Sequence, residues 1–576
     1  MKSDDKREPL FDAAESQTPS MYGTSMRENR ETQATPSPDG GGGRSGKTKC
    51  RTSDAYVAGE SDGPIVPAKR ANNAETPARS KSCDTRRRKG ESTGNTNIDL
   101  NRAEDAAESV EERGSTKGNA LQTTARRTPG RVSASSGLQR VRAAARRDKE
   151  ARFTALLHHV TPGLLRASYY ALKRTASPGV DGVTWKEYEA DLHGRISDLH
   201  ERVHRGSYRA KPSKRVWIPK ADGRQRPLGI AALEDKIVQQ AVRTILEQIY
   251  EEDFVGYSYG FRPGRSCHNA LDALYVGITR RKVNWVLDAD IRGFFDAIDH
   301  VWMMKFLEHR IADRRILRLI RKWLRAGVSE DGQWSKTEVG TPQGAVISPI
   351  LANVFLHYVF DLWAKQWRNR NATGDMIVVR YADDFVVGFQ HRRDAERFLR
   401  ELGERLEKFG LELHPDKTRL IEFGRFAAER RAKRGLGKPE MFDFLGFTHY
   451  CGKDLRGKFK LKRKTIPKRL RAALQKVKLE LRRRMHFPLD DVGRWLRSVI
   501  QGWNNYHAVP DNCDCLEAFR TQVSRYWYRV VKRRSQKGRK KWNWARMRRR
   551  LIRRWIPSVR ILHPYPDQRL IVTNPR

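Results

Sequence analysis

Long apolar runs and cysteines are both scarce in this chain of 576 residues. No run approaches the roughly 18 apolar residues that a membrane-spanning helix needs. Met1 is followed by polar and charged residues rather than by the apolar segment of a signal peptide. The six cysteines are scattered, and Cys513 and Cys515 have no second Cys or His pair at zinc-like spacing. These absences argue against a membrane protein, a disulfide framework and a zinc site, and they predict a cytoplasmic protein.

Acidic residues are also few, and one long stretch has none. The chain carries 114 Lys and Arg against 68 Asp and Glu, a formal net charge of +46. Between Glu517 and Asp567 there is no acid, and the basic residues there recur with Trp527, Trp542, Trp544 and Trp555. One basic run alone is typical of a solvated surface, but an excess that persists along the chain indicates a polyanionic partner, most simply nucleic acid.

The first 140 residues lack the apolar content of a folded domain. Their only aromatic residues are Phe11, Tyr22 and Tyr56, and they contain a glycine run at 40–43. Such a segment buries too little apolar surface to offset its ordering entropy. We therefore expect a disordered basic extension over residues 1–140, with order beginning near Leu138.

Hydrophobic periodicity predicts an α+β fold for the rest of the chain. Alternating residues at 215–220, a polar turn and the returning run 226–230 predict a hairpin, and the run 283–291 predicts a strand that ends in acids. From about Lys460 onward we expect only helices. Helical spacing covers residues 152–175, with an interruption at Pro162, and then 237–250, 302–323, 347–367, 393–408, 469–485 and 491–507. This order predicts a small antiparallel sheet backed by helices.

The most informative motif is Tyr381-Ala382-Asp383-Asp384, which lies between two apolar, β-branched runs. The pattern predicts a strand, a tight turn and a second strand. Two adjacent carboxylates at the tip of a hairpin repel each other, and bound divalent cations would offset that repulsion. Two metal ions held by carboxylates and clamping a phosphoryl group are the apparatus of nucleotide polymerisation.

A third carboxylate must then meet the hairpin. Asp288 and Asp290 share one face of the strand predicted at 283–291, because side chains alternate along a strand. We choose Asp290, which stands at the end of the strand, and the carbonyl of Ile291 can add a metal ligand. Asp296 and Asp299 follow shortly afterwards, and both fit the alternative role of a helix cap.

Eight sequence blocks, in this order, resemble the reverse-transcriptase domain of group II intron-encoded proteins. They are SPGVDG, IPKADGRQRPLGI, YGFRPGRS, DADIRGFFDAIDH, GTPQGAVISPILANVFL, YADD, GLELHPDKT and FDFLGF. The later basic helices, which contain GWNNYH at 502–507, resemble the maturase (thumb, or X) region of the same family. The resemblance covers roughly residues 140–565.

The resemblance implies a right-hand polymerase with fingers, a palm built on a small antiparallel sheet, and a helical thumb. It places a helical RNA-binding segment at 141–200, fingers and palm at 201–450, the thumb or maturase domain at 460–565 and a tail at 566–576. The implied activity is RNA-directed DNA polymerisation, with two Mg²⁺ ions held by Asp290, Ile291, Asp383 and Asp384.

The resemblance also implies roles at the nucleotide. Lys220 and Arg226 would grip the triphosphate, as a point charge and as a fork. Phe295 would lie under the sugar and exclude a 2′-hydroxyl, unless it is simply a core aromatic. Gln343 would sit by the template-base pocket, and Lys417 would approach the leaving phosphate.

For nucleic acid the resemblance implies several partners: the group II intron RNA, an RNA template with a DNA primer, dNTPs and a DNA target site. The helices around residues 153–170 and the basic C-terminal region would grip the intron RNA. The arginines that we expect to contact nucleic acid are Arg262, Arg265, Arg546, Arg548, Arg549 and Arg550.

The chain ends at Arg576 with no His- or Cys-rich block after His563, so it resembles the endonuclease-lacking branch of the family. Target cleavage would then fall to the intron RNA, or priming would use nascent DNA strands. We expect a protein of the bacterial cytosol that joins the nucleoid during mobility. Two alternatives remain open: a splicing factor whose polymerase has decayed, and another bacterial reverse transcriptase, of the retron or diversity-generating kind.

Overall fold

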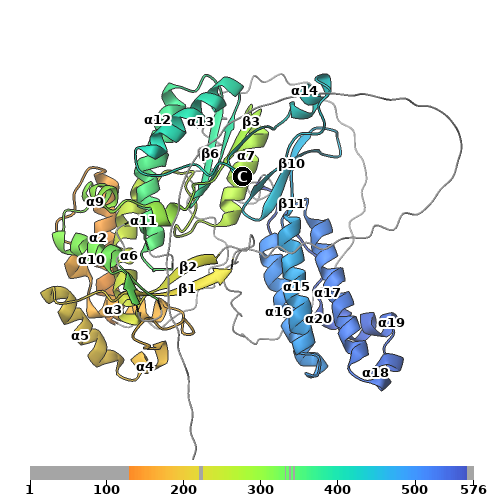
Figure 1. The fold of residues 1–576 in the computed structure, drawn as a ribbon, viewed down its shortest axis with the longest axis horizontal. Helices are drawn as coiled ribbons and strands as arrows, with labels where there is room; N and C mark the ends of the chain where they lie inside the picture. The colour runs from red at the N-terminus through yellow and green to blue at the C-terminus, as the bar shows by residue number, and fades with distance from the viewer. Residues whose placement is uncertain (1–128, 220–224, 331–332, 336–338, 342–343, 567–576) are drawn as a thin grey trace, which may run out of the picture. The chain divides into compact units, whose positions relative to one another are not determined.

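The computed structural model describes residues 129–219, 225–330, 333–335, 339–341 and 344–566, and they form three small sheets with flanking helices (Figure 1). Lys220, Gln343 and most of the expected disordered extension lie outside these residues. Within the described ranges, no helix combines the length and the apolar character that crossing a bilayer requires.

The central sheet has the strand order β6-β7-β3-β8, and every neighbouring pair is antiparallel. The strands are β6 (Met376–Tyr381), β7 (Asp384–Phe389), β3 (Trp285–Ala289) and β8 (Arg419–Glu422). The expected hairpin around the two adjacent acids and the strand within 283–291 are thus confirmed. They form because β-branched and aromatic residues suit a pleated sheet buried on both faces.

Alternate side chains of the central sheet enter two different cores. Val286, Ile377 and Val386 lie in one core with helix α7 (Cys267–Arg280). Leu287, Val378, Val387 and their neighbours lie in the other core, with helix α13 (Arg392–Glu407). Each such side chain stabilises the fold by about 1.5–3 kcal/mol when fully buried. Burial on both faces leaves the ends of the strands as the accessible part of the sheet.

A second sheet carries the hairpin expected at 215–230. Strands β1 (Ser213–Pro219) and β2 (Gln225–Ile230) pair antiparallel, with Ile218 opposite Arg226. Strand β4 (Val328–Glu330) joins β1 in parallel, and β5 (Gln333–Ser335) completes the order β2-β1-β4-β5.

The third sheet corrects the expectation of an all-helical region after Lys460. It consists of β9 (Phe442–Phe444), β10 (Phe447–Lys453) and β11 (Phe459–Thr465), in the order β11-β10-β9. In β11 the side chains of Leu461, Arg463 and Thr465 are buried, while the lysines between them are partly exposed. Buried and partly exposed residues alternate there as in a strand, but Arg463 and Thr465 on the buried side are polar, so hydrophobicity does not show the alternation.

Four α-helices precede the β1–β2 hairpin within the described residues, and two of them, α2 and α3, begin at other positions than the sequence pattern predicted. Helix α2 (Pro129–Arg147) begins before Leu138. Pro162 does not interrupt a helix; it occupies the first turn of α3 (Pro162–Ala171), where a missing N–H costs nothing, and Thr161 caps that helix. After the short turn η1 (Leu157–His159) and α3 come α4 (Trp185–Glu189) and α5 (Leu192–Arg205), and α6 (Leu233–Asp253) follows the β1–β2 hairpin.

The helix expected at 302–323 is in fact two helices. They are α9 (His300–Glu308) and α10 (Arg314–Arg325), preceded by the short α8 (Phe294–Ala297). The predicted apolar helix at 347–367 is confirmed as a continuous helical segment. It consists of α11 (Ser348–Leu356), a π-helical turn η2 (His357–Asp361) and α12 (Leu362–Arg370).

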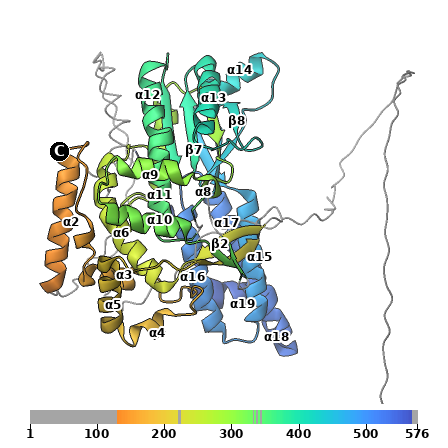
Figure 2. The same cartoon turned by 60° about the vertical axis from the view of Figure 1, so that its left-hand side comes forward.

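The C-terminal helices form their own core. Helices α15 (Pro467–Arg483), α16 (Leu489–His507) and α17 (Cys513–Arg533) lie side by side in both views (Figures 1 and 2) and confirm the two helices expected at 469–485 and 491–507. The apolar stripe of α16, including Val492, Leu496 and Ile500, is buried in this core. The remaining short elements are α14 (Ala427–Lys433), α18 (Gln536–Lys541), α19 (Trp544–Met547), η3 (Arg548–Ile552) and α20 (Arg553–Trp555).

Asp313 caps α10 and also holds a distant segment. Its carboxylate accepts hydrogen bonds from the backbone N–H groups of Leu156 at 2.8 Å, Leu157 at 3.0 Å and Arg315 at 3.0 Å. Burial opposes ionisation, but these bonds and the Arg315 guanidinium lower the pKa of Asp313 to about 2. A carboxyl whose pKa falls on folding stabilises the protein above its unfolded pKa of about 3.9, and that contribution is lost as the pH falls towards 2.

We expect Asp313→Ala to lower the free energy of unfolding by about 3 kcal/mol at pH 7, because a helix cap and two further buried N–H groups lose their acceptor. Chemical denaturation measures this loss. The difference in unfolding free energy between wild type and Asp313→Ala should become smaller as the pH falls from 4 to 2, because Asp313 then becomes protonated. Asp299→Ala is the matched control: Asp299 caps α9 through a single bond to the Trp302 N–H at 2.7 Å, and its loss should cost about 1 kcal/mol. Equal losses for both variants would contradict the double role of Asp313.

Candidate active site

A two-residue turn joins β6 to β7 and carries the adjacent acids. Tyr381 pairs with Asp384, so Ala382 and Asp383 form the turn. Ala382 has a φ of 57°, a left-handed conformation that the first residue of such a turn usually leaves to glycine. Asp383 is half-buried and Asp384 is exposed as a residue. A non-glycine residue in this conformation at a charged turn is the kind of backbone strain that gathers at functional sites.

The register of the sheet brings Asp290 to the same place. Ala289 pairs with Phe385, so the chain beyond β3 runs on from Asp290 towards Asp384. Burial, and then the charge of Asp290, raise the pKa of Asp383. Burial among protein atoms, followed by the charges of Asp383 and Asp290, raises the pKa of Asp384 to about 7, although the residue keeps an exposed surface. The charge of Asp290 is therefore close enough to disfavour the ionisation of both Asp383 and Asp384.

Two cationic side chains lie close to these acids. The Lys417 ammonium contacts Asp290 Oδ2 at 2.6 Å. Both Lys417 and Arg226 act against the rise in the pKa of Asp383. The segment that carries Lys417 is held against the end of β3, because the His414 N–H donates to the Asp290 carbonyl at 2.8 Å and Ile291 bridges Leu413. Side chains from three separate parts of the sequence thus meet around the β6–β7 turn.

The carboxylates of Asp290, Asp383 and Asp384 are suitable ligands for a divalent cation, but their side chains are not in the positions that would coordinate one. Within the described ranges, no group of three or more His, Cys, Asp and Glu side chains has the geometry to hold a metal ion. The Lys417 ammonium lies against Asp290 instead, where it supplies a positive charge. Crowded carboxylate oxygens are the ligands that hard cations prefer, and a cation would relieve the mutual repulsion of Asp290, Asp383 and Asp384.

The remaining acids near β3 have different surroundings. Asp288 pairs with Arg419 at 3.3 Å, and burial raises its pKa to about 6. Asp299 is confirmed as a helix cap, of α9. Asp296 is not one, because it lies inside α8, whose N-cap position is held by Gly293.

Phe295 lies in α8, a few residues beyond Asp290. Its ring is half-buried and meets the Phe294 ring edge-on, with centroids 5.3 Å apart. The Thr341 N–H donates to the Phe295 carbonyl at 2.8 Å, which ties α8 to the loop that precedes α11. Partial burial is compatible both with a core aromatic and with a ring that has one face open to a ligand.

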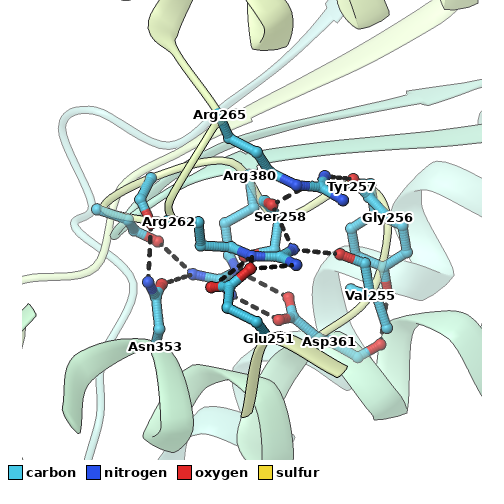
Figure 3. Close-up of polar contacts among 12 residues, drawn as sticks. Glu251, Val255, Gly256, Tyr257, Ser258, Arg262, Arg265, Asn353, Asp361 and Arg380 are labelled. Atoms are coloured by element: carbon cyan, nitrogen blue, oxygen red, sulfur yellow. Dashed lines mark hydrogen bonds and ion pairs between the residues drawn. The ribbon is translucent and has the colours of Figure 1, made fainter. Parts of the chain in front are cut away.

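Arg262 does not fit the expected contact with nucleic-acid phosphates. Its side chain is 3% exposed and pairs with Glu251 at 3.1 Å. It also donates to the carbonyls of Val255 and Ser258, both at 2.8 Å. Arg262 is therefore an internal brace of the loop between α6 and α7. Arg265, from the same loop, is half-buried and donates to the carbonyls of Gly256 and Ser258 (Figure 3).

The C-terminal arginines differ in their exposure. Arg548, Arg549 and Arg550 are exposed on η3. Arg546 is half-buried and donates to the Lys541 carbonyl at 2.7 Å. The first three thus have the accessible charge that a polyanion needs.

Sequence reasoning missed Arg380, which precedes the acidic turn on β6. It is fully buried and paired with Asp361 on η2 (Figure 3). One signal was available: Arg380 is the only charged residue in the otherwise apolar stretch 376–382. A charge inside a buried strand requires a partner.

Comparisons with known proteins agree with this arrangement. Residues 218–449 match the family described as reverse transcriptase (RNA-dependent DNA polymerase). Protein YkfC of Escherichia coli K12 is 34% identical over 279 residues, which cover 43% of this chain and 73% of YkfC. Group II intron-encoded protein LtrA of Lactococcus lactis subsp. cremoris is 34% identical over 272 residues, which cover 46% of this chain and 44% of LtrA. An uncharacterized 91 kDa protein in the cob intron of Schizosaccharomyces pombe is 44% identical over 162 residues, 28% of this chain and 20% of that protein. The chain thus spans most of YkfC but less than half of LtrA.

Proposed function

We propose that this chain, which belongs to the reverse transcriptase (RNA-dependent DNA polymerase) family and is of the group II intron-encoded type, copies an RNA template into DNA from a DNA primer. It also binds its intron RNA and promotes splicing and mobility into a DNA target site. The observation that carries the proposal is the crowding of Asp290, Asp383 and Asp384 around one turn, with Lys417 and Arg226 beside them.

Asp290, Asp383 and Asp384, with the carbonyl of Ile291, would hold divalent cations, for which we propose two Mg²⁺. When bound, such ions activate the primer 3′-hydroxyl and neutralise charge on the triphosphate. The chain supplies the positions of the ligands. The bridge between Ile291 and Leu413 uses the Asp290 carbonyl and the Arg292 N–H, so this pairing does not consume the Ile291 carbonyl.

The basic side chains bind the phosphates. Arg226 extends from the β1–β2 hairpin and acts electrostatically on Asp383, which suits a fork that grips a triphosphate at the acidic turn. Lys417 is half exposed while it contacts Asp290, so its ammonium is accessible to a leaving phosphate. Lys220 is proposed to act with Arg226, and Gln343 to contact the template base. Phe295 is proposed to lie under the sugar of the incoming nucleotide.

The intron RNA is proposed to contact two basic regions: the helical segment 141–200 and the C-terminal helices of 460–565. Residues 201–450 then form the fingers and palm. The support for the C-terminal region is the exposed row Arg548, Arg549 and Arg550, close in sequence to the partly exposed Trp544 ring. Arginine side chains bind phosphates, and aromatic rings stack on unpaired bases.

The catalytic acids give the direct test of polymerisation. Asp383→Asn and Asp290→Asn should each reduce primer extension on an RNA template by about 10³-fold or more, because several kcal/mol of charge stabilisation disappear. Binding of RNA, measured by filter retention, should change little.

Asp288→Asn is the matched control for the acids, since it makes the same chemical change on the same strand face at a carboxylate already paired with Arg419. We expect it to retain activity within about tenfold of wild type. Wild-type-like extension by the Asp383 or Asp290 variant would exclude the proposed site. A wild-type protein that binds and splices intron RNA but extends no primer would favour the alternative of a splicing factor.

Phe295→Val should admit a 2′-hydroxyl and raise rNTP use relative to dNTP use by about 10- to 100-fold, the scale of selectivity that a pocket gains from small differences in shape. Single-nucleotide kinetics with matched dNTP and rNTP measure the ratio. The dNTP kcat/KM should stay within several-fold of wild type. An unchanged ratio would identify Phe295 as a core residue.

Replacement of Arg548, Arg549 and Arg550 by Gln should weaken binding of intron RNA and flatten its dependence on salt, by roughly 2 in the slope of log K against log salt if all three contact phosphates. Protein-assisted splicing at near-physiological salt should fall, whereas the catalytic-acid variants should still splice.

The control removes the same charge elsewhere, by replacing Arg393, Arg400 and Lys408 with Gln at exposed positions on and just after α13. It should leave splicing unchanged. Normal splicing with poor polymerisation in the Arg548–Arg550 variant would show that the region serves the polymerase alone.

A further inference from the structure

Arg380 is a buried arginine whose every donor has an acceptor. Both Arg380 and its partner Asp361 have side chains that are 0% exposed. A guanidinium has five N–H donors in a fixed plane. Arg380 Nε donates to Asp361 Oδ1 at 2.7 Å, and Nη2 donates to Asp361 Oδ2 at 2.5 Å and to Ser258 Oγ at 2.7 Å. Nη1 donates to Asn353 Oδ1 at 3.2 Å and to the Ala382 carbonyl at 2.9 Å.

Apart from the Ala382 carbonyl, these acceptors come from three different elements (Figure 3). Arg380 is on β6, Asp361 ends the π-helical turn η2, Asn353 is on α11, and Ser258 lies in the loop between α6 and α7. We call Arg380, Asp361, Asn353 and Ser258 the Arg380 cluster. The fifth acceptor, the Ala382 carbonyl, belongs to the acidic turn itself. The cluster therefore joins three neighbouring elements to the backbone that carries Asp383.

The backbone of the loop between α6 and α7 also contacts β6 and the turn directly. The Arg380 N–H donates to the Tyr257 carbonyl at 2.9 Å, and the Tyr259 N–H donates to the Arg380 carbonyl at 2.8 Å. A Cβ added at Gly260 would overlap the backbone nitrogen of Ala382. Asn353 Nδ2 in turn donates to the Gly260 carbonyl at 2.7 Å. Asn353 thus connects the guanidinium to the glycine that packs against the turn.

We propose that Arg380 is a positioning residue for the reaction: its bond to the Ala382 carbonyl, braced by the rest of the cluster, fixes where Asp383 and Asp384 stand relative to Asp290. Ala382 has a positive φ, and a turn in that conformation needs outside bonds to keep it. Lysine has only three donors on one flexible ammonium and cannot satisfy the same set of acceptors. The inference rests on the proposed polymerase function and adds to it a residue that touches neither substrate nor cation.

A plain stabilising role for the ion pair is the competing explanation, and a double replacement separates the two. Arg380→Met with Asp361→Leu removes the pair without leaving a buried charge unpartnered, a change that well-packed interiors often tolerate. We expect a thermal midpoint near that of wild type and unchanged RNA binding. Because small displacements of reacting groups are costly, kcat for primer extension should fall about 100-fold while KM for dNTP changes little.

The matched control is a second buried pair, Arg310 with Asp253 at 2.9 Å, whose side chains are 4% and 10% exposed. Arg310→Met with Asp253→Leu makes the same chemical change away from the acidic turn. At a temperature where it is folded, this variant should extend primers like wild type. If both double variants lose kcat in proportion to their loss of stability, or if both keep full kcat, Arg380 has only a structural role and the inference is overturned.

Asn353→Leu provides a second route if the double replacement does not fold. It keeps the number and branching of the side-chain heavy atoms and leaves the Arg380–Asp361 pair intact, but it cuts the link between the guanidinium and Gly260. We expect kcat to fall about tenfold with KM for dNTP and RNA binding unchanged; wild-type kcat in the folded variant would overturn the inference. A wild-type protein that does not polymerise would contradict the proposed function instead, so the two failures are distinguishable.

Discussion

Repulsion among carboxylates is the constraint on which the arrangement of the central sheet depends. Asp383 and Asp384 are adjacent in the chain, and the β3–β7 register leads Asp290 towards them. Burial first, and then the charges of the neighbouring carboxylates, raise the pKa values of Asp383 and Asp384, so keeping these groups ionised here costs free energy. Lys417 offsets part of that cost by contact, and Arg226 does so from the hairpin. The same carboxylates, held close together, form a site where a bound cation would be stabilised electrostatically.

The acidic turn is held from the protein interior by a buried ion pair and its hydrogen bonds, not by apolar side chains alone. An unpartnered charge in that position would cost about 3–5 kcal/mol, so Arg380 and Asp361 are tolerated only as a pair with complete hydrogen bonding. His357 adds no charge to this region, because burial lowers its pKa to about 4 and it stays neutral at physiological pH. Directional bonds can hold a strained turn in one place, whereas apolar packing is not directional.

Local sequence pattern predicted the elements that carry the acids. The two β-branched runs around Asp383 and Asp384 are long enough to identify a hairpin, and the apolar residues 285–287 identify the strand that leads to Asp290. The pattern failed where a residue's role is decided by a distant partner. The motif YGFRPGRS predicts that Arg262 contacts nucleic acid. In the structure its side chain is buried, pairs with Glu251 and donates to two backbone carbonyls.

Other misses have equally physical causes. The polar residues on the buried side of β11 conceal its alternation, and Asp313 divides the helix expected at 302–323 by capping α10 and binding the backbone near Leu156. Asp361 lies 19 residues before Arg380, on a different element, so no local pattern connects them. The roles of Lys220, Gln343 and Phe295 stay predictions.

The π-helical turn η2 restricts how this segment can evolve. Successive residues of an α-helix are rotated by about 100° around the helix axis, and a π-helical turn accommodates one additional residue within a continuous helix. Asn353 and Asp361 sit on opposite ends of the stretch that includes η2, yet both face the same guanidinium. Insertion or deletion of one residue between them would rotate one acceptor away from the other. Homologous sequences that keep this arginine are therefore free to vary the composition of the stretch far more than its length.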